Sequence, residues 1–317
     1  MKIHARVAES VDEQYVCPTC RGDLAAAGDG LSCASGHRFA VVDGVPRFVA
    51  DEGYAESFGL QWQVFSHAQL DSETGTPATR ARFFSGTGWP ERMAGERILE
   101  AGCGMGRFTD VLLSTGADVF SFDYSRAAEV THRHFASRGA RVCQASIYEM
   151  PYRRGWFDRV FCYGVIQHCP DVKQAFFALV EMVKPGGCLA VDVYDRLRMF
   201  FNARYRVRWL TRRLPKPMLL RLCQAIVPAY MRIVPPLHPW NQLVVPIKDY
   251  RGRLPGMTRE KQIELSVLDT MDALSPAFDH PQYVRTMRAW CREARLDEVR
   301  VVRRGNGIEV RARRPLR

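Results

Sequence analysis

The chain has 317 residues, of which 47% are hydrophobic, and these values are typical of a globular protein with room for one large domain and a small module. No apolar segment reaches the roughly 18 uninterrupted residues that a membrane-spanning helix needs, and the first residues lack the apolar stretch of a signal peptide, so we expect a cytoplasmic protein. The formal charge is +11, and residues 196–232 contain ten basic residues and no acidic one.

Three cysteines and a histidine near the N-terminus have the spacing of a metal site. Cys17, Cys20, Cys33 and His37 follow the pattern C-x2-C-x12-C-x3-H. Two close pairs of soft or borderline ligands suit tetrahedral zinc, and four protein ligands leave no open position, so we expect a structural Zn²⁺. A small head buries little apolar surface, and metal binding would supply the missing free energy of folding. The alternative is a set of incidental cysteines beside a free histidine.

Short apolar runs alternate with amphipathic segments in the middle of the chain. The runs predict strands at residues 97–102, 118–123, 141–146, 157–166 and 188–194. The segments between them predict helices at 107–117, 125–140 and 172–183, and "KPGG" at 184–187 predicts a turn. This alternation indicates an α/β fold with a Rossmann-like, doubly wound parallel sheet, in which ligands bind beyond the carboxyl ends of the strands.

A glycine-rich loop follows the first of these strands. Gly102, Gly104 and Gly106 occupy alternate positions, so the third glycine comes one residue too early for the dinucleotide fingerprint G-x-G-x-x-G. Such a loop turns sharply and lets a ligand lie against bare backbone. Asp123 ends the second strand, where it can accept hydrogen bonds from ribose hydroxyls, and Glu100 would repel a pyrophosphate but suit a cationic amino group. These features favour S-adenosylmethionine (SAM) over NAD.

Four stretches together resemble one family. "ILEAGCGMGRFTDVL", "VFSFDYS", "FDRVFCYGVIQHCPD" and "VKPGGCLAV" have the order and spacing of class I SAM-dependent methyltransferases, of the methyltransferase type 11-like group, over roughly residues 95–195. The resemblance implies that Glu100, Gly102 and Gly104 line the methionine portion of SAM. It also implies that Asp123 binds the ribose and that Tyr124 packs against one face of the adenine.

One position departs from that family's pattern. After the third strand the family commonly has an aspartate that accepts from the adenine amino group, whereas this chain has Ser146. The serine hydroxyl can still accept a hydrogen bond, and the backbone of Ile147 can meet the edge of the ring. We therefore expect an altered affinity for the cofactor rather than loss of binding.

The catalytic candidates follow the fourth strand. His168, in "GVIQHCPD", would lie at the carboxyl edge where the methyl group should point, so it is our first candidate for a general base or for positioning the acceptor. A packing or helix-start histidine is an equally good interpretation. Tyr163 on the same strand is a weaker catalytic candidate. Before the first strand, "YAESFGLQW" carries aromatic residues that either form a lid over the cofactor or simply pack in the core.

The chain divides into five parts. We expect a zinc-ribbon module at residues 1–50, a helical lid and connector at 51–94, the SAM-binding core at 95–195, an inserted basic cap at 196–258, and a C-terminal part at 259–317 that completes the methyltransferase domain with a hairpin. Seven prolines between positions 215 and 246 predict short helices in the cap.

The basic cap leaves the acceptor open. We expect a SAM-dependent methyltransferase whose acceptor is a small molecule, or a sugar or lipid-linked intermediate, that carries negative charge. The zinc ribbon resembles that of bacterial ribosomal-RNA guanine methyltransferases, which makes methylation of an rRNA or tRNA base the alternative. A SAM-binding scaffold without turnover and a non-methylating enzyme that uses SAM are further alternatives. Residues 196–232 would meet an anionic membrane surface, RNA or the substrate, and we predict no DNA partner.

Overall fold

The computed structural model of the protein describes most of the chain. The described residues are 15–199, 202–236, 244–251, 256–304 and 307–316. The first fourteen residues of the expected zinc-ribbon module therefore lie outside the described part.

A mixed sheet organises the described part of the chain, where it has seven strands in the order β10-β11-β9-β8-β5-β6-β7. The strands are β5 (Arg97–Ala101), β6 (Asp118–Asp123), β7 (Arg141–Gln144), β8 (Phe157–Cys162), β9 (Val183–Tyr194), β10 (Asp297–Arg304) and β11 (Gly307–Arg313). Strands β5 to β9 run parallel, while β11 inserts between β9 and β10 and is antiparallel to both. The predicted doubly wound sheet and the C-terminal hairpin are thus confirmed.

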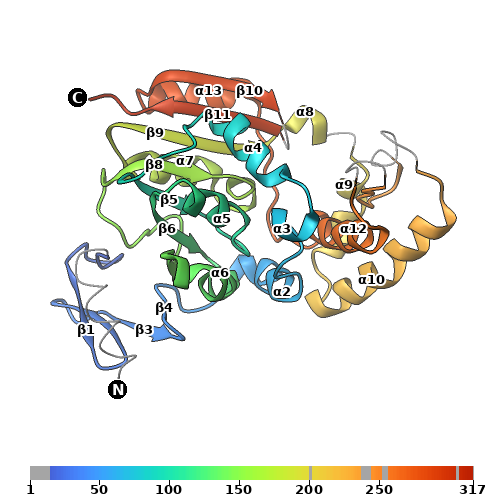
Figure 1. Ribbon diagram of the computed structural model, residues 1–317, viewed down its shortest axis with the longest axis horizontal. Helices are drawn as coiled ribbons and strands as arrows, with labels where there is room; N and C mark the ends of the chain where they lie inside the picture. Colours follow the sequence, from blue (N-terminus) through green and yellow to red (C-terminus); the bar gives the residue numbers. More distant parts are fainter. Residues whose placement is uncertain (1–14, 200–201, 237–243, 252–255, 305–306, 317) are drawn as a thin grey trace.

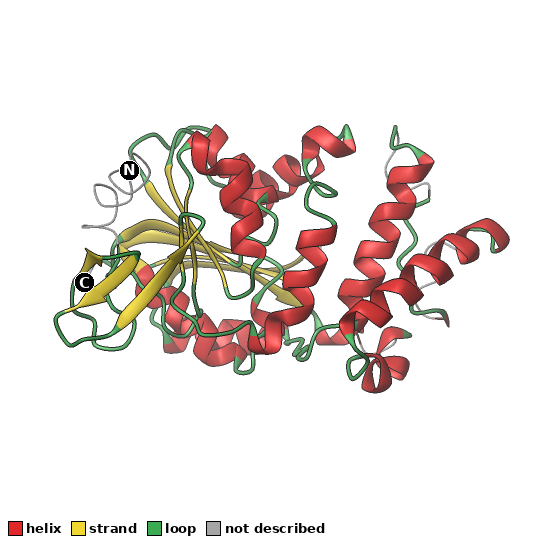
Figure 2. Cartoon of the chain, turned by 90° about the horizontal axis from the view of Figure 1, so that it is seen from below, coloured by secondary structure: helices red, strands yellow, loops and turns green. Residues whose placement is uncertain are grey.

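Helices cover both faces of this sheet (Figure 2). They are α4 (Ala78–Thr87), α5 (Arg107–Ser114), α6 (Ala127–Phe135), α7 (Val172–Met182) and α13 (Val284–Glu293). Successive side chains of a strand point to opposite faces, and β5 shows the result. Leu99 packs in the core shared with α7 and α13, whereas Ile98 packs in the core shared with α4 and α5. The carboxyl ends of β5, β6 and β8 remain free to carry a site.

The N-terminal module is a small antiparallel sheet that packs beside the edge strand β7. Its strands are β1 (Leu24–Ala27), β2 (Gly30–Cys33), β3 (Arg38–Val42) and β4 (Val45–Pro46). Just after β4, the backbone N–H of Phe48 donates to the carbonyl of Gln144 at 2.8 Å. The ring of Tyr15 packs against both Phe48 and Tyr152. The module therefore covers an edge that would otherwise expose unpaired backbone groups.

A helical cap lies at the opposite end of the molecule from this module (Figure 1). Its elements are η1 (Gly53–Ala55), α2 (Glu56–Val64), α3 (Asp71–Thr74), α8 (Arg196–Met199), α9 (Arg204–Thr211), α10 (Lys216–Ile233) and α12 (Arg259–Leu274). These helices bury a core of their own, in which Phe65 just after α2, Val227 of α10 and Leu268 of α12 meet. No helix among the described residues is both long and apolar enough to span a membrane.

Two expectations about local structure are wrong. The prolines do not limit the cap to short helices, because α10 runs from Lys216 to Ile233. Pro217 lies in its first turn, where no backbone donor is needed, and Pro228 is accommodated inside the helix. The segment 184–187 is also not a turn before a strand. It belongs to β9, where the pairing with β8 shifts between Val183 and Cys188 as an irregularity.

Candidate active site

The loop after β5 has the geometry that only glycines permit. Gly102, Gly104 and Gly106 all have positive φ angles, of 76°, 56° and 95°. A Cβ atom on Gly102 would lie 2.3 Å from Val165, and one on Gly104 would lie 3.1 Å from the indole nitrogen of Trp62. The loop therefore presents bare backbone at the carboxyl end of the sheet, as its sequence predicts.

Asp123 joins this loop to the end of β6. Its Oδ2 accepts a hydrogen bond from the backbone N–H of Gly104 at 2.9 Å, and its Oδ1 accepts from the N–H and the hydroxyl of Ser125. Burial raises the pKa of the Asp123 carboxyl, and hydrogen bonds from the Ser125 backbone and side chain oppose the rise. Each carboxylate oxygen has two acceptor sites, so acceptor capacity remains toward the cavity that Asp123 lines.

Glu100 lies beneath the loop and does not line that cavity. Its Oε2 accepts hydrogen bonds from the hydroxyls of Thr109, at 2.5 Å, and Ser121, at 2.8 Å. Burial raises the pKa of Glu100 to about 7. In this arrangement the carboxyl group ties β5 to α5 and β6, and it supports the loop from below.

The other residues of the expected adenine site lie around the ends of β6 and β7. Tyr124 and Ile147 line the cavity, whereas Ser146 and Gly106 do not. The hydroxyl of Ser146 accepts from the backbone N–H of Tyr148 at 3.2 Å. The ring of Tyr54, from η1, stacks on Tyr124 with 4.7 Å between centroids. One face of Tyr124 is thus covered by the segment that precedes the sheet.

A cavity of about 520 Å³ lies over the glycine loop. It is lined by the loop and Asp123 on one side, by His168 and Tyr163 on another, and by the cap. The volume falls within the roughly 300–1,000 Å³ of sites that enclose small molecules.

The helix α2 forms one wall of the cavity. Phe58, Gln61 and Trp62 all line it, together with Tyr54. Gln61 is fully buried, and neither its amide nitrogen nor its amide oxygen has a hydrogen-bond partner among the described residues. Buried polar groups are nearly always hydrogen-bonded, so this amide on the cavity wall can pair with a ligand or with water that enters the cavity. The sequence interpretation of these residues as a lid fits this geometry.

The two ring nitrogens of His168 differ in their hydrogen bonding. Its Nδ1 lies 3.0 Å from the carbonyl oxygen of Phe278, an acceptor, so Nδ1 carries the proton and donates it. No described residue is hydrogen-bonded to Nε2, and the side chain lines the cavity. Burial lowers the pKa of His168, against the opposing effect of Asp279 and Asp272. The neutral ring therefore presents a lone pair at Nε2 to the cavity.

Tyr163 lines the same cavity but is unsuited to act as a base. Its hydroxyl is buried and has no hydrogen-bond partner among the described residues. Burial raises the pKa of the phenol well above its usual range, and the carboxylate of Asp192 raises it further. The guanidinium of Arg82 lies 5.6 Å from the centre of the Tyr163 ring and pairs with Asp192 at 2.6 Å. Tyr163 can donate a hydrogen bond to a ligand, and it keeps its proton.

A charge cluster that the sequence did not reveal lines the rest of the cavity. Arg107 directly follows the glycine loop, and its side chain forms no hydrogen bond or ion pair with another described residue. Burial lowers the pKa of Arg107 to about 10, with a further lowering from Arg82, so the group stays cationic at neutral pH. Asp269 and Asp272 approach from α12, and Asp269 accepts hydrogen bonds from Tyr250 and Gln69.

Two arginines of the basic segment hold the cap in place. Arg204 and Arg208 are buried, and both pair with the buried carboxylate of Asp279, at 3.2 and 3.9 Å. Arg208 also donates to the carbonyl of Pro276 at 2.6 Å. Part of the sequence's basic patch is therefore structural, because these side chains attach the cap to the segment after α12.

The N-terminal cluster has the donor set and spacing of a metal site. The ligand atoms of Cys17, Cys20, Cys33 and His37 all lie within 4.8 Å of one another. Cys20 and Cys33 have their sulfurs 3.6 Å apart, and the Nδ1 of His37 lies 3.6 Å from the sulfur of Cys17. Tetrahedral zinc with sulfur ligands at about 2.3 Å requires ligand separations of about 3.7 Å. The Cys3His group fits such an ion.

The sequence missed the residues that bring charge to the acceptor side. Arg82 and Arg107 have no motif of their own, although Arg107 directly follows the third glycine. Lys248 and Tyr250 reach the cavity from a segment between two helices of the cap. Only the three-dimensional packing of the cap on the sheet brings these side chains together.

Residues 99–191 match a family model that describes a methyltransferase domain. A ubiquinone biosynthesis O-methyltransferase of Thiobacillus denitrificans is 31% identical over 108 residues, which cover 33% of this chain and 47% of the relative. An uncharacterised protein of Synechococcus is 34% identical over 118 residues, which cover 35% of this chain and 28% of the relative. The chain thus spans less than half of the length of each of these two curated relatives.

Solved structures also resemble this chain. A protein of Pyrococcus horikoshii aligns with a TM-score of 0.46 and 13% identity, covering 80% of this chain and 97% of that chain. The match of the family model coincides with β5 to β9, the part of the sheet that carries the glycine loop, Asp123 and His168.

Proposed function

We propose, on the premise that residues 99–191 form a class I SAM-dependent methyltransferase domain, that the protein transfers a methyl group from SAM to a small, negatively charged acceptor. The observation that carries this proposal is the shared cavity. The glycine loop and Asp123 face it from the cofactor side, and the unpaired Nε2 of His168 faces it from the other.

The residues on the cofactor side fit SAM. The bare backbone at Gly102 and Gly104 provides the close approach, and Asp123 supplies acceptors for the ribose hydroxyls. The unpaired amide of Gln61 offers both a donor and an acceptor to the same ligand. Bound SAM would supply a methyl group on a sulfonium, which is already strongly electrophilic. The protein's main task is then to align the acceptor and exclude water.

The acceptor side favours a ligand with both an aromatic or sugar ring and an anionic group. Phe58 and Tyr194 flank His168 with ring centroids 5.0 and 5.5 Å away, which gives an apolar wall for a planar or ring-shaped ligand. Arg107 supplies a cation that forms no ion pair with any described residue. The similarity to an O-methyltransferase of ubiquinone biosynthesis supports a hydroxyl as the acceptor group.

His168 would accept the proton of that hydroxyl. The hydrogen bond from Nδ1 to Phe278 fixes the tautomer and the orientation of the ring, so that Nε2 receives the proton as the new oxygen–carbon bond forms. Burial keeps the ring neutral before the reaction. Asp272 and Asp279 then stabilise the positive charge that the ring gains.

We further propose that the Cys3His group holds a structural zinc ion. The four ligands would complete a tetrahedron and leave no position for water or a substrate. Hydrogen bonding from the backbone N–H of Gly22 lowers the pKa of the Cys20 thiol to about 6, which favours the thiolate that a metal needs.

Calorimetric titration with SAM, and separately with NADH, tests the cofactor assignment. We expect binding of SAM alone. Asp123→Asn should weaken it about ten-fold or more, because hydrogen bonds to a charged acceptor are replaced by neutral ones. Asp118→Asn, at the exposed start of the same strand, is the matched control. Equal affinity of the Asp123 variant and the wild type would contradict the ribose assignment.

Transfer of labelled methyl groups tests the activity. The acceptors to compare are anionic small molecules with a free hydroxyl and transfer or ribosomal RNA at two salt concentrations. Transfer to RNA with a steep dependence on salt would replace the small acceptor with a nucleic acid. Binding of SAM without transfer to any acceptor would leave a SAM-binding scaffold.

A further inference from the structure

The outer face of α10 is apolar, and no described residue covers it. Exposed side chains at Met218, Leu222, Ile226 and Ile233 retain between 41% and 78% of their accessible surface. The first three are four residues apart, and Ile233 follows seven residues later, so all four lie on one side of the helix. Isolated exposed apolar residues are normal, but an aligned row of them indicates an interaction surface.

This outer row is separate from the face by which α10 packs. Leu219, Cys223, Val227 and Met231 form the buried row and contact the core shared with α2 and α12. Packing within the chain therefore explains the inner row only. The outer row needs a partner outside the described part of the chain.

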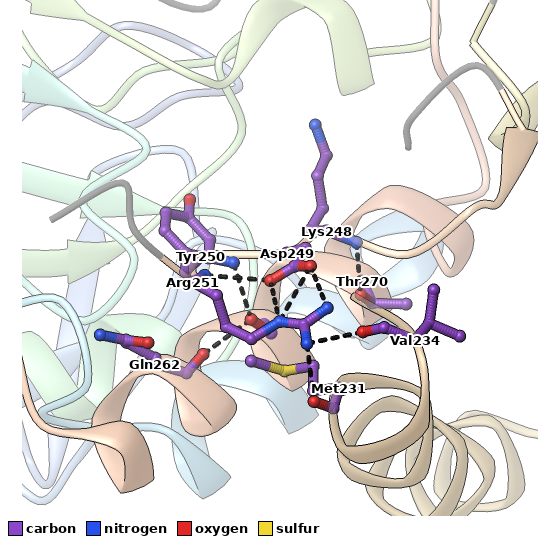
Figure 3. Close-up of polar contacts among 9 residues, drawn as sticks. Met231, Val234, Lys248, Asp249, Tyr250, Arg251, Gln262 and Thr270 are labelled. Carbon is purple, nitrogen blue, oxygen red and sulfur yellow. Dashed lines mark hydrogen bonds and ion pairs between the residues drawn. The ribbon is translucent and has the colours of Figure 1, made fainter. Parts of the chain in front are cut away.

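The helix presents its outer row rigidly. The guanidinium of Arg251 donates to the carbonyls of Met231 and Val234, both at 2.7 Å, and pairs with the buried carboxylate of Asp249 (Figure 3). The backbone N–H of Lys248 donates to the hydroxyl of Thr270 on α12. These bonds satisfy the last carbonyls of α10 and hold its C-terminal end against α12.

Positive charge borders the apolar row. Arg221 and Arg232 are eleven residues apart, about three helical turns, so they share a side of α10 next to the row. Arg212 and Arg213 lie in the turn that leads into the helix, after the exposed Trp209. None of these four arginines forms an ion pair with a described residue, and residues 196–232 contain no acidic side chain.

We propose that this surface, formed by the outer row of α10 and the arginines around it, docks on an anionic lipid bilayer. Apolar side chains that enter the acyl region, beside arginines that meet lipid phosphates, are the two features of an interfacial helix. RNA fits less well. Base stacking requires planar side chains, whereas the outer row of α10 is aliphatic. The proposal does not depend on the methyltransferase activity, because it uses residues outside the cavity.

Vesicle sedimentation tests the proposal with the full chain and without any cofactor or acceptor. We expect the protein to bind vesicles of phosphatidylcholine mixed with phosphatidylglycerol and to bind pure phosphatidylcholine more weakly. The double variant Leu222→Gln/Ile226→Gln should lower the partition coefficient about ten-fold or more, because two apolar side chains no longer enter the bilayer. Both residues are exposed, so the substitutions leave the cap core intact.

A matched control replaces exposed apolar residues elsewhere. Val64→Gln/Val299→Gln removes a similar apolar area from other surfaces and should leave vesicle binding unchanged. Arg221→Gln/Arg232→Gln should lower binding to the anionic vesicles about five-fold for each charge, and high salt should remove that difference.

Four results would overturn the proposal. The first is a wild-type protein that does not sediment with anionic vesicles. The second is a Leu222/Ile226 variant that binds as well as the Val64/Val299 control. The third is a concentration-dependent dimer in sedimentation velocity that the Leu222/Ile226 substitutions abolish without vesicle binding, since the row would then join two copies of the chain. Salt-dependent RNA binding that needs the same arginines, in the absence of vesicle binding, would replace lipid with nucleic acid.

Discussion

The two sides of the cavity differ in how the chain builds them. The cofactor side comes from three neighbouring strand ends, between Gly102 and Ile147. The acceptor side combines the loop after β8 with elements of the cap, among them α2 and α12, which lie far apart in the sequence. A site made from consecutive strand–loop units leaves a spacing pattern in the sequence, whereas a site assembled by packing of distant helices leaves only isolated residues.

The charged groups on the two sides of the cavity also differ in whether the chain holds them in place. On the cofactor side, Asp123 and Glu100 are held by hydrogen bonds within the chain, so their geometry is fixed before any ligand arrives. On the acceptor side, Arg107 and the Nε2 of His168 have no partners among the described residues. Apart from the amide of Gln61, the polar groups of the first side are held in place before a ligand binds. The second side retains unsatisfied groups that would select the other ligand.

Among the substitutions on the two sides of the cavity, replacement of His168 should lower turnover the most. His168→Asn keeps a donor for the carbonyl of Phe278 and removes the lone pair at Nε2. We expect turnover with the acceptor found in the labelled-methyl screen to fall about 10²–10⁴-fold, the usual contribution of a general base. SAM affinity should stay the same, because the side chain lies on the acceptor side.

The pH dependence gives an independent readout. Burial lowers the pKa of His168, so the reactive neutral form persists below the ordinary histidine pKa and turnover should decline only as pH falls through that lowered value. His280→Gln, nearby but outside the cavity, is the control and should leave the profile unchanged. Unchanged turnover and an unchanged profile in His168→Asn would assign this histidine a packing role.

Replacement of Arg107 should have a smaller effect, on the affinity of the acceptor side for an anion. In Arg107→Gln the unpaired cation is lost, and with it a charge-assisted contact to an anion, worth about ten-fold or more in affinity. Inorganic phosphate is a simple probe, and it should raise the melting temperature of the wild type in the presence of S-adenosylhomocysteine but not that of the variant. Arg138→Gln, on the surface, is the matched control.

The same experiment decides which ligand the guanidinium meets. If Arg107 belongs to the acceptor side, SAM should bind wild type and variant with affinities within about two-fold of each other. A loss of SAM affinity equal to the loss of the phosphate effect would place the carboxylate of SAM at Arg107. The boundary between the two sides of the cavity would then move to include this residue.

The geometry of the strand ends on the first side could be anticipated from the sequence for a specific reason. The positive φ angles at the loop glycines and the position of Asp123 depend on contacts within adjacent strands, and the strand–helix alternation reveals those contacts. The sequence was less informative about Glu100 and Ser146, because it could not show that both side chains are engaged with neighbours instead of lining the cavity.

The second side could be predicted only in part. His168 follows a strand, so its place at the carboxyl edge was foreseeable, whereas its hydrogen bond to Phe278 was not. Ten basic residues in one segment suggested a single charged surface. The structure divides them, because Arg204 and Arg208 are buried on Asp279 while others surround the exposed row of α10. Charge counts cannot separate these roles.

Loss of the metal site in the N-terminal module should have the smallest effect on ligand binding in the cavity. Arg21 donates to the carbonyls of Met150 and Tyr152, and the backbone N–H of Val16 donates to that of Pro151. The module therefore braces the loop that follows Ile147 on the cofactor side. Cys17→Ser should remove the bound zinc and lower the melting temperature, since a structural metal contributes to folding.

Cofactor binding should respond only weakly to the same change. We expect SAM affinity in Cys17→Ser to fall no more than a few-fold, because the glycine loop and Asp123 keep their own contacts within the sheet. The control Arg153→Gln breaks an exposed ion pair with Asp23, which contributes at most about 1 kcal/mol to stability. It should change neither the melting temperature nor the SAM affinity measurably. Complete loss of SAM binding in a folded Cys17 variant would make the metal site part of the cofactor side. Retention of stoichiometric zinc would contradict the ligand set instead.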